Sequence, residues 1–230
     1  MKNLLYKEFM LAIHPMVWVF ALFGLMIFIP DYPNSVFVIY VMMFFIFLFQ
    51  GSRENNDTFY SALLPIKKRD IVKARFLSIL AFEMLSIIMA AVAGISTYFM
   101  GYGPMGKQIG SLSNGGGVGI SPTLAFFGFV FLAFAIFNSV FLNMHYHQKF
   151  RMLVPMILSS VLGYLPLILA EIFASMQGTP LESISHQLDV VANDTLVCQL
   201  LIFLGGIGTY VVSFFLTYFS CAKKFERIDL

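Results

Sequence analysis

The sequence predicts an all-α integral membrane protein with six transmembrane helices, forming a single transmembrane domain over residues 1–230. Three observations support this prediction. Hydrophobic residues make up 59% of the chain and charged residues only 11%, against about a quarter in an ordinary soluble domain. Six apolar stretches interrupt the chain, and a helix needs about 20 residues to cross the hydrocarbon layer. The basic residues are confined almost entirely to alternate connections between these stretches.

The six apolar stretches are the predicted spans. They cover Ile13–Ile29, Ser35–Phe49, Phe76–Met100, Ser121–Met144, Met152–Ala174 and Val197–Cys221. The third to sixth are long enough to cross a bilayer, whereas the first two fall short of the required length of about 20 residues. We expect polar turns to lengthen these two, or the bilayer to be thin around them. The spans use most of the 230 residues, which leaves no room for a soluble catalytic domain.

The distribution of Lys and Arg predicts the orientation of the spans. The N-terminus, the second and fourth connections and the C-terminal tail contain two, six, two and three of the fourteen basic residues. The first, third and fifth connections contain only Lys107. Positive charge near the ends of spans stays in the cytoplasm. Both termini are therefore expected to face the cytoplasm.

Segments outside the spans have predicted structures of their own. Residues 1–14 form a basic amphipathic helix in the membrane interface, and Pro15 turns the chain into the bilayer. The alternative is that this helix is only a frayed start of the first span. Residues 100–120 and 175–196 form the outer loops. The first loop is rich in glycine, and the second contains a capping pattern that predicts a short helix near Pro180–Ala192.

The longest connection on the basic side, residues 50–75, carries the clearest candidate for an interaction site. Polar residues that can cap a helix come first, an apolar and aromatic face follows, and a proline ends it. In order, these residues are Glu54, Asp57, Thr58, Phe59, Tyr60, Leu63, Leu64 and Pro65. An apolar patch displayed in water usually marks a protein contact. The alternative is a plain re-entry turn with a basic anchor that meets anionic lipid.

This connection resembles the stretch between the second and third spans of type-2 ABC permeases. The similarity rests on acidic residues, a Leu-Pro-Ile tripeptide and a basic re-entry into the membrane. The matching residues are Glu54 through Asp57, Leu64-Pro65-Ile66, Arg69, Ile71-Val72 and Ala74-Arg75. Lys67 departs from the pattern, because a small or hydroxyl residue commonly follows Leu-Pro-Ile. The whole chain is most similar to the small permeases of bacterial exporters for amphipathic peptides such as phenol-soluble modulins.

The resemblance implies a membrane subunit of an ATP-driven exporter in a bacterial plasma membrane. Residues 54–65 would form a coupling helix that docks on a separate ABC ATPase, present in two copies, which binds ATP and magnesium. This chain would bind no cofactor itself. It would pair with a second copy or a related permease around a path for an amphipathic peptide. A bacteriocin-immunity or sensing complex would use the same architecture without bulk export.

Two polar residues inside the predicted spans are candidates for the substrate path. Glu83 lies eight residues beyond Arg75, about 12 Å into the membrane, and Asn138 lies at a similar depth on the fourth span. A carboxylate within a bundle faces a cavity or a partner, and the alternative is a structural, hydrogen-bonded Glu83. Small residues every four positions on the third and sixth spans predict close helix packing, within the chain or between two copies. They are Ser86, Ala90, Gly94, Gly205, Thr209, Ser213 and Thr217.

Other patterns do not support an enzyme, a metal site or a nucleic-acid partner. Residues 101–108 contain G-x-G-x-x-G and most of a phosphate-binding loop, but no strand precedes them and they are expected outside the cell. His145 and His147 fall on different helix faces, so no metal site is predicted. An intramembrane protease would need its catalytic groups at one depth, whereas Glu83 and Glu171 lie near opposite faces of the membrane.

Overall fold

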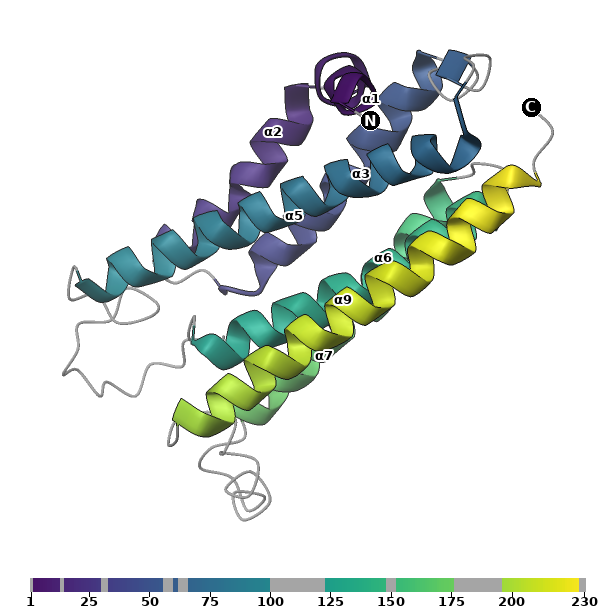
Figure 1. The fold of residues 1–230 in the computed structure, drawn as a ribbon. Helices are drawn as coiled ribbons and strands as arrows, with labels where there is room; N and C mark the ends of the chain where they lie inside the picture. The colour runs from purple at the N-terminus through teal and green to yellow at the C-terminus, as the bar shows by residue number, and fades with distance from the viewer. Residues whose placement is uncertain are drawn as a thin grey trace.

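The computed structural model describes residues 2–12, 15–29, 33–55, 60–61, 66–99, 123–147, 152–175 and 196–227. These residues form helices and contain no strand (Figure 1). Five helices are long and apolar enough to cross a membrane, and the number rises to six if a bent helix pair near the N-terminus counts as one span. The predicted all-helical membrane fold is therefore confirmed, with five or six candidate spans.

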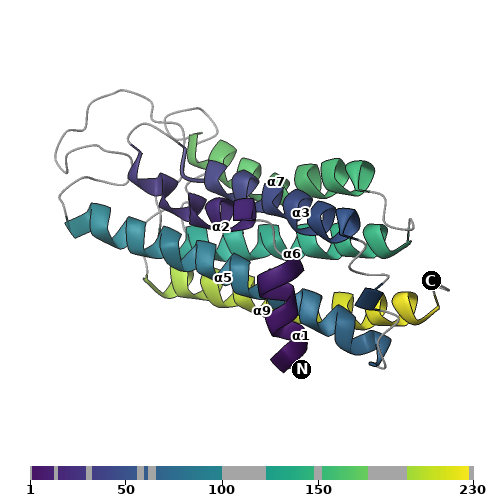
Figure 2. The same cartoon turned by 90° about the horizontal axis from the view of Figure 1, so that it is seen from above.

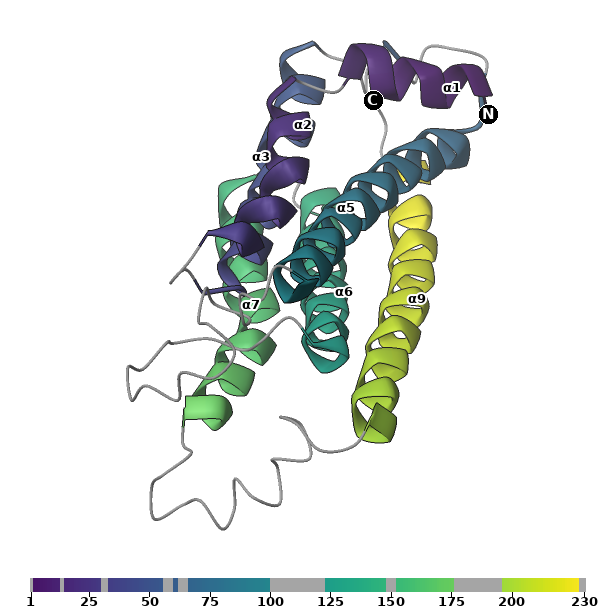
Figure 3. The ribbon, with the colours of Figure 1, turned by 90° about the vertical axis from the view of Figure 1, so that its left-hand side faces the viewer.

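The bent pair corresponds to the predicted interfacial helix and first span. α1 (Lys2–Lys7) and the π-helical η1 (Glu8–Ala12) come first, and α1 lies across one end of the bundle (Figure 3). α2 (Pro15–Ala21) enters the bundle and continues as the 3₁₀ helix η2 (Leu22–Phe28). The bend between the segment Leu4–Met10 and the segment Pro15–Phe28 measures 86°. A 3₁₀ helix rises about 2.0 Å per residue instead of 1.5 Å, so α2 and η2 together reach about 24 Å. The 3₁₀ turns therefore lengthen the short first span.

The second and third spans are longer than the sequence predicted. α3 (Val36–Glu54) continues five residues beyond Phe49, so polar residues lengthen the second span as expected. α5 (Lys68–Phe99) begins eight residues before Phe76. Four residues of this added stretch are buried against the bundle, which favours one continuous helix. The basic stretch expected to lie ahead of the third span is thus the first two turns of its helix.

The remaining spans form a second group of helices beside the first group of α2, η2, α3 and α5 (Figure 1). They are α6 (Leu124–His147), α7 (Leu153–Ser175) and α9 (Leu196–Glu226). α6 lies between α7 and α9 and packs against both (Figure 2). Aromatic rings connect the groups, since the ring centroid of Phe45 on α3 lies 4.7 Å from that of Phe137 and 5.2 Å from that of Phe141 on α6.

The bundle has one strongly basic end. At this end, which we call the basic end, α3, α6 and α9 finish and α5 begins, and it carries Arg53, Lys67–Arg69 and Lys223–Arg227. Residues 100–122 and 176–195 lie outside the part of the chain that the structure describes. They include the predicted outer loops and the helix expected near Pro180–Ala192.

Small residues set the helix spacing within each group. A Cβ atom built on Gly206 of α9 would lie 2.2 Å from the carbonyl oxygen of Gly128 on α6. One built on Gly24 of η2 would lie 2.2 Å from the carbonyl oxygen of Ser86 on α5. The Ser86 hydroxyl also donates to the Ala21 carbonyl oxygen at 2.9 Å. The close packing predicted for the third span therefore occurs within the chain, against the first span.

Gly206→Ala should destabilise the second group, because the new methyl group must push α9 away from α6. Overpacking a tight contact costs about 1–3 kcal/mol, so the midpoint of thermal unfolding in detergent should fall. Gly205→Ala is the matched control, since a Cβ on Gly205 meets no described atom within 4 Å. Its midpoint should be no lower than that of the wild type, because Ala favours a helix more than Gly does. Equal midpoints for the two variants would contradict the close α6–α9 contact.

Candidate functional site

A buried polar network joins three helices in the interior of the bundle. Glu83 of α5, Asn138 of α6 and Tyr210 of α9 are 0%, 1% and 3% exposed. Asn138 Nδ2 lies 3.0 Å from both carboxylate oxygens of Glu83, and the Tyr210 hydroxyl donates to Glu83 Oε2 at 2.6 Å. A carboxylate removed from water is costly unless hydrogen-bond donors surround it, and these two side chains supply them. The network therefore holds α5 of the first group against α6 and α9 of the second.

Polar contacts also join the two groups nearer both ends of the bundle. At the basic end, Arg69 of α5 forms a two-pronged ion pair with Glu226 of α9, with N–O distances of 2.5 and 3.1 Å. Toward the opposite end, Ser35, which precedes α3, donates to Glu171 of α7 and shares a hydrogen bond of 2.8 Å with Tyr164. The boundary between the groups is thus held by polar contacts at three levels, and the Glu83 network is the middle one.

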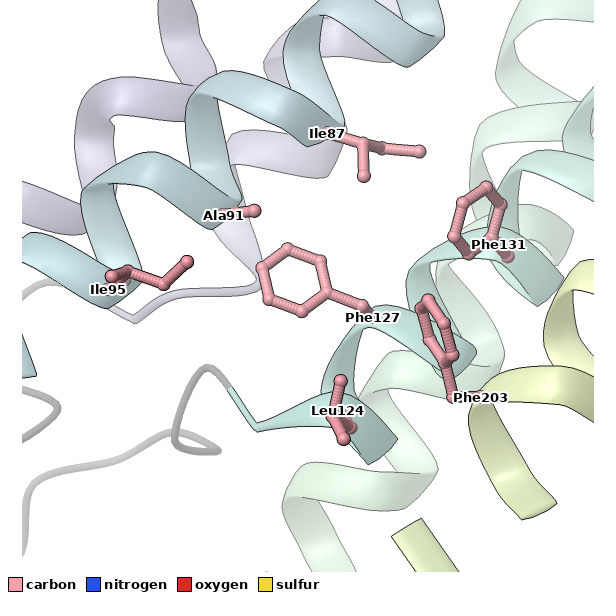
Figure 4. Close-up of a pocket in the computed structure, with 8 residues that line it drawn as sticks. Ile87, Ala91, Ile95, Leu124, Phe127, Phe131 and Phe203 are labelled. Carbon is pink, nitrogen blue, oxygen red and sulfur yellow. The ribbon is translucent and has the colours of Figure 1, made fainter. Parts of the chain in front are cut away.

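An apolar groove of about 430 Å³ adjoins the Glu83 network on the side away from the basic end. Its walls are Ile87, Ala91, Gly94 and Ile95 from α5, Leu124, Phe127 and Phe131 from α6, and Phe203 from α9. Figure 4 shows Phe127 extending from α6 toward Ala91 on α5. Ile87 follows Glu83 by one helical turn, and the ring of Phe131 lies 5.6 Å from that of Tyr210. The groove therefore begins one helical turn beyond Glu83, whose buried carboxylate does not line it.

The sequence placed Glu83 and Asn138 at similar depths, and the structure brings them into direct contact. Their assignment to a substrate path stays a prediction. Tyr210 was missed, because a buried tyrosine and a lipid-facing one look alike within an apolar span. Glu83 and Tyr210 lie about four helical turns from Arg69 and Glu226 respectively, but depth alone does not single out Tyr210 among the residues of α9.

A second buried cluster anchors the N-terminal segment to the first group. Arg75 Nε on α5 lies 3.0 Å from Glu8 Oε2 on η1, and both side chains are almost fully buried. Arg75 also donates to Ser52 Oγ at 2.9 Å and to the Leu48 carbonyl oxygen at 3.3 Å, and its guanidinium lies 5.6 Å from the ring centroid of Phe49. From the sequence, Arg75 was expected to be a surface cation, and Glu8 had no predicted role. The pair instead ties η1, α3 and α5 together.

The surroundings of Arg75 bear on the expected depth of Glu83. The value of about 12 Å was counted from Arg75, at 1.5 Å per residue, as if Arg75 marked the membrane boundary. Arg75 is buried against Glu8 of η1, whereas α5 begins seven residues earlier, at Lys68. Along the axis of α5, Glu83 lies about 12 Å from Arg75 and about 22 Å from Lys68. The depth of Glu83 in the membrane stays a prediction.

The family of the chain follows from a match that spans nearly all of it. Residues 3–226 match the family model described as ABC-2 family transporter protein. The chain belongs to this family. It is therefore a permease, the membrane subunit of an ABC transporter. Comparison with curated proteins and with solved structures gives no match.

Only two of the predicted coupling residues of this ABC-2 permease lie in the described part of the chain. Glu54 ends α3, where its carboxylate accepts a hydrogen bond from Gln50 Nε2 at 2.8 Å, so it closes α3 rather than opening a new helix. Tyr60 is helical and 64% exposed at the basic end. Next to it, Ser61 is buried and accepts a hydrogen bond from Lys7 of α1. The other predicted coupling residues, outside the described part, are Asp57, Thr58, Phe59, Leu63, Leu64 and Pro65.

The two histidines of the permease that the sequence singled out occupy different environments. His145 is buried, with its ring centroid 4.6 Å from that of Phe49 and 5.6 Å from that of Phe141. His147 is exposed at the end of α6. Within the described residues, no group of three His, Cys, Asp or Glu side chains could hold a metal ion. His145 therefore acts in aromatic packing between α3 and α6.

Proposed function

We propose that this permease is the membrane subunit of an ATP-driven exporter for amphipathic peptides. The observation that carries the proposal is the position of Glu83, which lies between the two groups of helices and one helical turn from the apolar groove. A peptide with a cationic face and an apolar face would place the first against the carboxylate and the second in the groove. Asn138 and Tyr210 donate hydrogen bonds to the Glu83 carboxylate while the two groups of helices are in contact. Separation of the groups would break these bonds and free the carboxylate to bind the peptide.

The proposed coupling route runs from the segment at residues 54–65 to Glu83 along α5. Lys7 of α1 donates to Ser61, and the next residue, Glu8, pairs with Arg75. Glu83 follows Arg75 by eight residues on the same helix. Rigid helices and packed polar contacts are the elements through which distant sites can be coupled. Movement of the coupling segment by an ATPase would therefore shift α5 and, with it, the Glu83 network.

The proposed assembly contains two permeases above two copies of a separate ABC ATPase, which bind ATP and magnesium. The second permease is another copy of this chain or a related one, and this chain binds no cofactor. Support for a permease pair comes from α9, where a Cβ on Gly205 or Gly208 would meet no described atom within 4 Å. Small residues on an uncovered face allow helices to approach closely in lipid.

A bacteriocin-immunity or sensing complex is the second proposal. The observation in its favour is that Glu83 is fully buried and hydrogen-bonded, so the described residues form a closed contact at this level. A sensing complex would bind its peptide and stimulate ATP hydrolysis without moving the peptide across the membrane. Export and sensing therefore differ in whether a labelled peptide accumulates inside inverted membrane vesicles supplied with ATP.

Cysteine labelling tests the proposed location of the chain in a bacterial plasma membrane with both termini in the cytoplasm. The background would have Cys198 and Cys221 replaced by Ala. A single cysteine at Gly116 or at Ser183 should react with an impermeant reagent added to intact cells, because few basic residues lie in these connections. A cysteine at Asn56 should react only after the cells are opened. Labelling at Asn56 from outside would reverse the orientation.

Glu83→Gln tests the proposed contact with cationic cargo. The amide removes the negative charge but keeps the size of the side chain, so assembly and basal ATP hydrolysis should be retained. A hydrogen bond to a charged group contributes about 1.5–3 kcal/mol, so the peptide concentration that half-stimulates ATP hydrolysis should rise by about tenfold or more. Glu171→Gln, near the opposite end of the bundle, is the control and should change this concentration little. A wild-type rate of peptide export in Glu83→Gln cells would exclude the proposed role.

A further inference from the structure

A charged cleft lies at the basic end, between the first turn of α5 and the last turns of α9. Its volume is about 600 Å³. Three cations line it, which are Arg69 from α5, Lys223 from α9 and Arg227 immediately after α9. The one carboxylate that lines it is Glu226. Both oxygens of this carboxylate accept hydrogen bonds from Arg69 in a bidentate ion pair. The cleft therefore retains the excess positive charge of Lys223 and Arg227.

The cations of the cleft continue an apolar stripe on α9. Phe215, Phe219 and Lys223 follow one another at intervals of four residues, which places them on one face of α9. Arg227 follows immediately after the helix and lines the same cleft. Phe215 is 58% and Phe219 is 65% exposed, and Lys223 and Arg227 are exposed as well. Neither Lys223 nor Arg227 makes a side-chain hydrogen bond or ion pair within the described part of the chain. The face is thus apolar inside the membrane and cationic at its boundary.

We propose that this cleft binds the headgroup of an anionic phospholipid, with an acyl chain lying along Phe219 and Phe215. Charge complementarity identifies the occupant, because basic pockets between helices at the membrane boundary suit anionic lipid headgroups. The apolar stripe below the cations distinguishes a phospholipid from a soluble phosphate, which would contact the cations alone. Because α5 and α9 both line the cleft, the bound lipid also bridges the two groups of helices. This inference does not depend on which substrate the permease carries.

Quenching of tryptophan fluorescence by brominated lipid tests the proposal in bilayers. The chain has a single tryptophan, so Trp18→Phe combined with Phe219→Trp places one indole beside the cleft. Vesicles of phosphatidylcholine would contain a small fraction of brominated phosphatidylglycerol or brominated phosphatidylcholine. The anionic lipid should quench at about one-thirtieth of the concentration of the neutral one, as expected for two boundary cations that contribute about 1 kcal/mol each. Adding Lys223→Gln and Arg227→Gln should bring the ratio of the two quenching concentrations to about one. Adding Arg53→Gln, which also lies at the basic end, should leave this ratio unchanged.

The control for a general surface preference is Leu201→Trp with Trp18→Phe. Leu201 is exposed on the same helix but lies about 27 Å along its axis from Phe219. The tryptophan at this position should be quenched equally by the anionic and the neutral brominated lipid. Equal quenching by the two lipids at Phe219→Trp would overturn the proposal, as would a preference that survives Lys223→Gln and Arg227→Gln. Displacement of the anionic lipid by millimolar glycerol phosphate would also overturn it, in favour of a soluble anion.

Discussion

Arg75→Met should destabilise the permease strongly, because it leaves the carboxylate of Glu8 buried without its cation. Arg75 and Glu8 are 5% and 1% exposed, and Arg75 also donates to Ser52 and to the Leu48 carbonyl oxygen. Breaking a buried ion pair by removing one partner costs about 3–5 kcal/mol, whereas replacing both partners can be nearly neutral. The measurement is the midpoint of thermal unfolding of the purified protein in detergent.

The double variant Arg75→Met with Glu8→Gln separates the buried charge from the lost packing. The double variant has no isolated carboxylate, so its midpoint of thermal unfolding should lie between that of Arg75→Met and that of the wild type. Arg53→Met is the control, because Arg53 is exposed at the basic end. Its midpoint should lie close to that of the wild type. A wild-type midpoint for Arg75→Met would show that the pair does not hold η1 against α5.

The parts of the fold that the sequence predicted are those that depend on local patterns. Apolar stretches and the alternation of basic connections are both read along the chain, and they indicated a helical membrane protein. The bend between α1 and α2 follows the amphipathic N-terminal segment and Pro15, which are neighbours in sequence. Glu83 and Asn138 could be related because each lies at a countable distance from the end of its own span.

The parts that were missed depend on contacts between residues far apart in the chain. Arg75 was expected at the surface, because its pairing with Glu8, 67 residues earlier, leaves no local signature. For the same reason the first two turns of α5 were taken as a connection that precedes the span. Tyr210 joins Glu83 across 127 residues, and only the packing of α5 against α9 brings their side chains together. Pairings of this kind require the folded arrangement of the helices.

In the proposed mechanism, a separate ATPase drives this permease through the segment at residues 54–65. The sequence places Phe59 and Leu63 on its apolar face, and the adjacent Tyr60 is 64% exposed at the basic end. Phe59→Asp with Leu63→Asp would put two charges into the expected contact with the ATPase. The few residues that dominate an interface each contribute about 2 kcal/mol or more, so losing two of them should weaken binding by about 1,000-fold.

Lys67→Asp is the matched control, because it adds a carboxylate at an exposed position of the same connection, outside the apolar face. The most direct test is the amount of ATPase that copurifies with equal amounts of folded permease after mild detergent extraction. We expect the ATPase to remain with the wild-type and Lys67→Asp permeases and to be lost from the Phe59→Asp, Leu63→Asp variant. Retention of the ATPase by that variant at the wild-type ratio would contradict the account.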